Sequence, residues 1–157
     1  MKPLFLPLMI ALLALAMQAQ AAGDPGGSSP PAFTDPVLQQ VGEATGRKDW
    51  AAAAAILRDA LAKSPDNADY HNLYAYSVRK GTNPNMDLVF KHYNEALRLN
   101  AKHRDAHEYI GEAYLMVGNV AKAKEHLAQL DKLCFFRCAE STDLKKSIAE
   151  YEKTGKR

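Results

Sequence analysis

The sequence lacks a large excess of charge of either sign. Lys and Arg total 20 against 18 Asp and Glu, which gives a formal net charge of +2 over 157 residues. Loss of Lys2 with the predicted leader described below would lower this value to +1. A partner selected by bulk charge, such as a nucleic acid or an anionic membrane surface, is therefore disfavoured.

Recognisable catalytic motifs are also missing. The chain has no Gly-rich phosphate loop, no nucleophile elbow and no zinc-protease helix signature. Glu108 and Glu112 are two carboxylates one helical turn apart, but like charges at that spacing more often form a solvated face than an acid/base couple. We therefore expect a protein that is not an enzyme and that uses no cofactor.

Long apolar runs are confined to the N-terminus. Lys2 is followed by the apolar run Leu4 to Met17 and by the small residues of Ala19-Gln20-Ala21, a pattern typical of a secretion signal. The run is shorter than the about 20 residues that span a bilayer, and no cysteine follows it that could carry a lipid. Residues 1–21 are predicted to be a cleaved signal peptide, with a retained anchor as the alternative.

Export by this signal predicts a periplasmic protein without stable membrane insertion after cleavage. The next residues, 22–33, consist mainly of Gly, Ser and Pro and offer little to bury. They are predicted to form a flexible linker.

Beyond residue 33 the sequence has no alternating strand pattern, and apolar residues recur at helical spacing between Gly, Pro, Asn and Asp. An internal repeat runs through this part. Val41, Ala75 and Gly111 are separated by 34 and then 36 residues. The ordered part is therefore predicted to be all helical and built from repeated units.

A second set of positions repeats with the intervals reversed. Leu57, Tyr93 and Leu127 are separated by 36 and then 34 residues. Two extra residues between the helices of the middle unit, in the turn at 82–85, explain the reversal. Without them the period is about 34 residues throughout, which is the period of the tetratricopeptide repeat.

The third unit resembles the tetratricopeptide pattern closely, and the first unit supplies the other half of the resemblance. The matching residues are the run from Arg104 to Tyr114, then Gly118, Ala123 and Leu127, and in the first unit Trp50, Ala53, Leu57, Ala60 and Pro65. The resemblance implies an all-α, right-handed solenoid of about three helix pairs. Their approximate ranges are 34–67, 68–103 and 104–134, with a turn and a capping helix in 135–157.

The last unit of such a stack exposes an apolar end, which the segment after Cys138 is predicted to cover. A closing helix is expected over Asp143–Lys153, capped by Ser141 or Thr142. Its apolar stripe consists of Leu144, Ile148 and Tyr151.

Cys134 and Cys138 flank three residues at the junction between the last repeat and the closing helix. In an oxidising compartment a structural disulfide is the favoured interpretation, with the helix ending between the two cysteines. Free thiols, or metal or redox chemistry, are the alternatives. A thioredoxin-like site is disfavoured because it has two residues between its cysteines.

Five histidines raise the question of a metal site. His103 and His107 lie four residues apart at a helix start, a spacing that can place two imidazoles on one metal. However, His107 and its counterpart His71 occupy the position where the family packs a tryptophan, and His92 corresponds to His126. Repetition of the architecture explains these residues better than coordination, so no metal site is predicted.

In proteins similar to this one, the first helices of successive units line a concave groove that receives a peptide or a partner helix. The resemblance implies that the groove residues here are Leu38, Asn72, Tyr76, Arg79, Glu108, Glu112 and Leu115. The two glutamates disfavour a ligand with an acidic tail and favour one with basic or aromatic groups. The alternative is that these side chains are merely solvated and that another face binds.

The resulting hypothesis is a non-catalytic periplasmic adaptor or assembly factor that binds a protein or peptide partner. Two other functions stay open. One is a permanent structural subunit of an envelope complex, which would pack through an apolar flank. The other is a metal-handling periplasmic protein, which would depend on the histidines and on Cys134 and Cys138.

Overall fold

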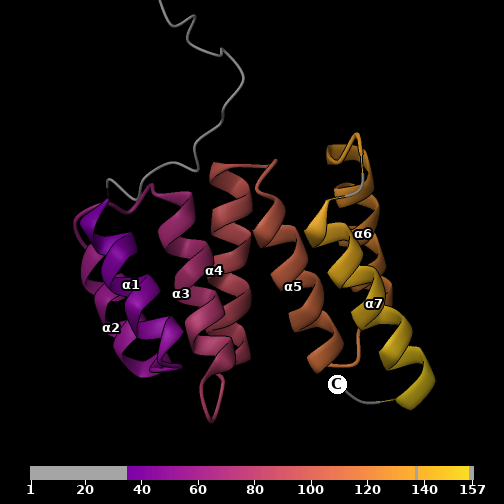
Figure 1. Ribbon diagram of the computed structural model, residues 1–157, viewed down its shortest axis with the longest axis horizontal. Coiled ribbons are helices and arrows are strands. Elements are labelled where there is room, and N and C mark those ends of the chain that lie inside the picture. The colour runs from indigo at the N-terminus through magenta and orange to yellow at the C-terminus, as the bar shows by residue number, and fades with distance from the viewer. Residues whose placement is uncertain (1–34, 137, 156–157) are drawn as a thin grey trace, which may run out of the picture. The chain divides into compact units, whose positions relative to one another are not determined.

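The computed structural model describes residues 35–136 and 138–155, and this part of the chain is helical with no β-strand, as predicted (Figure 1). Its seven helices are α1 (Pro36–Gly46), α2 (Trp50–Leu61), α3 (Ala68–Lys80), α4 (Met86–Leu99), α5 (Arg104–Met116), α6 (Val120–Leu133) and α7 (Ala139–Thr154). The predicted signal peptide and linker lie outside the described residues. None of the helices in the described ranges is long and apolar enough to cross a membrane.

Each of the first six helices is preceded by a residue whose side chain accepts a hydrogen bond from a backbone N–H of the first turn. The capping residues are Asp35, Asp49, Asn67, Asn85, His103 and Asn119. A cap of this kind satisfies one of the N–H groups that have no partner inside the helix, so it fixes where the helix starts.

Consecutive helices pack against each other, and short turns connect them (Figure 1). The turn between α1 and α2 and the turn between α5 and α6 each have three residues, whereas five residues separate α3 from α4. The two extra residues that the repeat intervals required are therefore in the predicted turn. Lys48 and Gly118 adopt positive φ angles of 59° and 76° in the two short turns.

The core consists of three clusters, and each contains one helix pair and the first helix of the next. The first cluster joins α1, α2 and α3 around Leu57, and the second joins α3, α4 and α5 around Tyr93. The third joins α5 and α6 to α7 through Leu144 and Ile148. The last helix thus completes the third cluster, as α3 completes the first.

Positions that correspond in the sequence repeat have similar environments. Val41, Ala75 and Gly111 are buried in all three units. The positions in the second helices behave alike, since Ala53, Val89 and Ala123 are also inaccessible to solvent. The sequence period therefore corresponds to a repeated pattern of burial.

The closing helix begins earlier than predicted, at Ala139 instead of Asp143, and neither Ser141 nor Thr142 caps it. The Ser141 hydroxyl donates to Asp131 and the Thr142 hydroxyl to the carbonyl of Cys138. The helix starts directly after Cys138, so both hydroxyls lie inside its first turn. The predicted apolar stripe is correct for Leu144 and Ile148, which are buried.

A substitution at Gly111 can test how closely α5 approaches α7. A Cβ atom at this position would lie 2.6 Å from Cδ2 of the buried Leu144. We expect Gly111→Val to lower the free energy of unfolding by about 1–3 kcal/mol through overpacking, as measured by urea denaturation. The matched control is Gly42→Val in α1, because no atom lies within 4 Å of a Cβ there.

Combining Gly111→Val with Leu144→Ala provides the internal check. We expect the double variant to lose less stability than the sum of the two single losses, because the valine occupies space that the leucine vacates. Strict additivity would contradict the packing of α7 on Gly111.

Candidate partner-binding surface

The α3 and α5 helices present two stripes of predicted groove residues at helical spacing. Asn72, Tyr76 and Arg79 follow one another along α3. Glu108, Glu112 and Leu115 have the corresponding positions along α5. Residues three or four apart lie on one face of a helix, so each set forms a single stripe.

Arg79 connects the two stripes. Its Nη2 lies 2.9 Å from Oε2 of Glu112, and its Nε donates to the Tyr93 hydroxyl at 3.2 Å. The side chain is almost completely buried, and an unpaired charge at that depth would be costly. Arg79 therefore links α3 to α4 and α5.

Two tyrosines flank this guanidinium. The rings of Tyr76 and Tyr109 lie 4.7 Å apart, and the Arg79 guanidinium carbon is 5.4 Å and 5.7 Å from their centroids. These are distances at which a cation interacts with the face of an aromatic ring. Trp50 extends the row, since its ring meets the Tyr76 ring edge-on at 5.7 Å.

Trp50 and Tyr109 belong to this aromatic row, and sequence reasoning missed both as site residues. Trp50 was interpreted only as the start of its helix. The residue that corresponds to Tyr109 in the second unit is Leu73, so the repeat pattern does not predict an aromatic side chain at this position. A cavity of about 310 Å³ lies beside Trp50, between the start of α2 and the end of α3.

Glu108 is half-buried among other carboxylates. Burial, followed by the charges of Glu112, Asp143, Asp105 and Glu140, raises the pKa of Glu108 to about 8. Glu112 pairs with Arg79, and Glu140 lies 3.5 Å from Arg104. Glu108 makes no ion pair with any described residue, and its raised pKa favours the protonated carboxyl.

The structure places the other predicted groove residues in more buried positions. Asn72 is 2% exposed, and its Oδ1 has no hydrogen-bond partner among the residues described. Leu115 is 1% exposed and belongs to the third core cluster. Leu38 packs against the first core cluster. The contacts thus bring together Tyr76, Arg79 and Glu112, with Glu108 beside them, but not Leu38 or Leu115.

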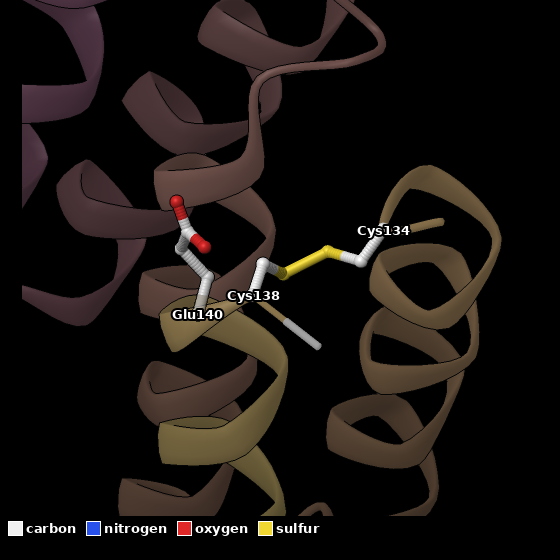
Figure 2. Close-up of side chains that lie close together, drawn as sticks. All are labelled: Cys134, Cys138 and Glu140. Atoms are coloured by element: carbon white, nitrogen blue, oxygen red, sulfur yellow. A yellow bond between two sulfur atoms is a disulfide. The ribbon is translucent and has the colours of Figure 1, made fainter. Parts of the chain in front are cut away.

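The two cysteines connect α6 to α7. Their sulfur atoms lie at disulfide distance, and their Cα atoms are 5.7 Å apart. Cys134 follows the last residue of α6 and Cys138 precedes the first of α7, so the helix ends between them as expected. Figure 2 shows the bridge with Glu140 of α7 near it.

Cys134, Cys138 and Glu140 also bring three potential metal-ligand atoms within 4.8 Å of one another. A cysteine binds a metal as its thiolate, and a disulfide has no thiolate. In the bridged form this cluster therefore fixes the turn instead of offering a metal site.

The histidines do not form the pair that their spacing in α5 suggested. His103 Nε2 lies 3.0 Å from Asp69 Oδ1, whereas His107 Nδ1 lies 3.0 Å from His126 Nδ1. His71 faces His92 in the same way at 2.8 Å. Burial, then the facing histidine, lowers the pKa of both His92 and His126 to about 4.

Comparison of the sequence with known proteins identifies no family for this chain. No protein-family model matches the chain, and no curated protein matches it in sequence.

The raised pKa of Glu108 predicts a pH dependence of stability. The protonated form is favoured by folding, so its contribution is complete below the ordinary pKa of 4.5 and is lost as the pH rises through about 8. We expect Glu108→Gln to make the free energy of unfolding decline less over this interval, as measured by urea denaturation at several pH values. The exposed Glu150→Gln on α7 is the matched control, and an identical decline in both variants would contradict the prediction.

The disulfide is expected to stabilise the turn by closing a short loop. On the chain-entropy estimate, Cys134→Ala combined with Cys138→Ala lowers the free energy of unfolding by about 2 kcal/mol. Urea denaturation of the variant, and of the unaltered protein with and without reductant, measures this value. Two free thiols in the mass spectrum of unreduced protein from the periplasm would show that the bridge does not form.

Proposed function

We propose that the helix pairs form a tetratricopeptide-type right-handed solenoid that acts as a non-catalytic periplasmic adaptor or assembly factor. The partner is a protein or peptide segment that binds across α3 and α5. The repeated burial pattern and the sharing of core clusters between successive pairs support the solenoid. A disulfide between Cys134 and Cys138 suits an exported protein, because such bonds persist in oxidising compartments.

The observation that carries the proposal is the half-buried Glu108 carboxyl, which has no counter-charge among the described residues. A Lys or Arg side chain of a partner would supply that charge and allow Glu108 to ionise. The adjacent Tyr109 and Tyr76 rings form an aromatic surface next to the carboxyl. This combination favours a partner with basic and aromatic groups.

Arg79 and Glu112 serve a different purpose in this proposal. Because they pair with each other in a buried position, they hold α3 and α5 at a fixed spacing and are not free to bind a ligand. Replacing Glu112 would leave Arg79 as a buried cation with one partner fewer, so loss of stability would obscure any loss of binding. Variants that test binding should therefore change Tyr76 and Glu108.

A permanent structural subunit is the second candidate, and one observation favours it. Phe135 and Phe136 are 93% and 82% exposed in the turn between α6 and α7. Two large apolar side chains side by side on a surface are typical of a contact with another molecule. On this alternative the partner would bind at the disulfide turn.

We expect Tyr76→Ala combined with Glu108→Gln to abolish capture of the partner from periplasmic extract, while Glu150→Gln captures it unchanged. For a captured partner, calorimetry at pH 7 in buffers of different ionisation enthalpy is expected to show release of a proton, because binding lowers the pKa of Glu108.

Retention of the partner by the Tyr76/Glu108 variant would contradict binding across α3 and α5. Loss of the same partner from a Phe135→Ser/Phe136→Ser variant would then favour the structural-subunit alternative.

A further inference from the structure

Two histidine pairs recur at corresponding positions of the second and third units. In the second unit, Nδ1 of His71 on α3 faces Nδ1 of His92 on α4 at 2.8 Å. In the third unit, His107 and His126 face each other through the same atoms at 3.0 Å. The repeat thus places the same two-imidazole geometry twice.

Hydrogen bonding assigns the protons of the first pair. His71 Nε2 lies 2.8 Å from the carbonyl oxygen of Pro65, which can only accept, so Nε2 carries the proton. Neutral His71 therefore presents a lone pair at Nδ1, toward His92. A histidine that ligates a metal commonly donates its other ring N–H to a backbone carbonyl in this way, which fixes its tautomer.

The first unit shows what the architecture itself requires at these positions. The repeat intervals align Val37 with His71 and Ile56 with His92, and both apolar residues pack against the first core cluster. An apolar pair therefore satisfies the packing of a unit. Both members of the pair are changed to histidine in the other two units.

The surroundings distinguish the two histidine pairs. A cavity of about 320 Å³ opens beside the first pair and is lined by Pro65, Asp66, His71, Lys91, His92 and Glu95. The residues that align with Asp66 and Glu95 in the third unit are Lys102 and Gln129. Only the first pair thus combines two imidazoles with carboxylates at these positions.

We propose that His71 and His92, together with Glu95, bind one divalent transition-metal ion of the kind that prefers imidazole ligands, such as Zn²⁺ or Cu²⁺. Glu95 lies one helical turn after His92 and lines the same cavity. Water would supply the remaining ligands. Two imidazoles and a carboxylate are ligands that suit Zn²⁺ and Cu²⁺ better than Mg²⁺ or Ca²⁺.

Binding needs three changes at the site: a proton shift, a separation of the two rings and a movement of Glu95 toward them. The proton that His92 Nδ1 donates to His71 moves through solvent to Nε2 of the same ring, for which the described residues show no hydrogen-bond partner. Both Nδ1 atoms then carry a lone pair, and the ring charges stay the same. With Zn–N bonds of about 2.0–2.1 Å, two nitrogens at a tetrahedral angle lie about 3.3 Å apart, so the rings separate slightly. Glu95 exchanges its exposed contact with Arg98 for the ion.

The test is calorimetric titration of the untagged mature chain with ZnCl₂, with MgCl₂ as the negative control. We expect one equivalent of Zn²⁺ to bind to the unaltered protein and none to bind at this site in His71→Val/His92→Ile. That variant carries the residues of the first unit, so it is expected to fold, which circular dichroism checks. His92→Gln provides a second variant with a smaller change.

Two further variants localise the ion. His126→Gln is expected to bind one equivalent of Zn²⁺ as the unaltered protein does, and Glu95→Gln is expected to bind it more weakly. The ¹⁵N resonances of the His71 and His92 rings are expected to shift on addition of Zn²⁺. Absence of stoichiometric binding, or binding that persists in His71→Val/His92→Ile and in His92→Gln, would overturn the proposal.

Discussion

The structure depends on one constraint, which is that no helix pair can cover its own apolar face. Leu57 of α2 lies in a cluster that α1, α2 and α3 share, and Tyr93 of α4 lies in one that α3, α4 and α5 share. The third pair needs a helix from outside the repeat, and α7 supplies it through Leu144 and Ile148. The Cys134–Cys138 bridge lies at the turn into α7, so it restricts how far this covering helix can separate. The burial of Leu144 and Ile148 and the disulfide thus both hold α7 against the last helix pair.

The sequence predicted the helices, their pairing and the longer middle turn, because burial repeats with the period and leaves a direct record in residues such as Val41, Ala75 and Gly111. It predicted the start of α7 poorly, since Ser141 and Thr142 have the composition of a cap but lie inside the first turn. Local composition cannot report that the helix begins immediately after Cys138. It also identified Leu115 as a groove residue from register alone, whereas its side chain belongs to the core.

The surface across α3 and α5 shows why site prediction was less complete than fold prediction. Tyr76, Arg79 and Glu112 were predicted because the resemblance to the tetratricopeptide pattern carries groove positions over by register. Their interaction with Tyr109 and Trp50 is a relation between units and has no counterpart in the repeat. The same limit applies to Glu108, whose pKa is raised by burial first and then by carboxylates of both α5 and α7. Such properties arise from packing and cannot be assigned from one segment alone.

The histidine pairs can be compared with the residues that stability alone would favour at the same positions. A buried polar pair gains little over an apolar pair of similar shape, because each group first loses its hydrogen bonds to water. The first unit has Val37 and Ile56 at these positions, so the architecture accepts the apolar solution. His71 and His92 therefore gain no evident packing advantage from being histidine. What they add is a pair of convergent nitrogens beside a carboxylate-lined cavity, and metal binding uses this chemistry whereas packing does not.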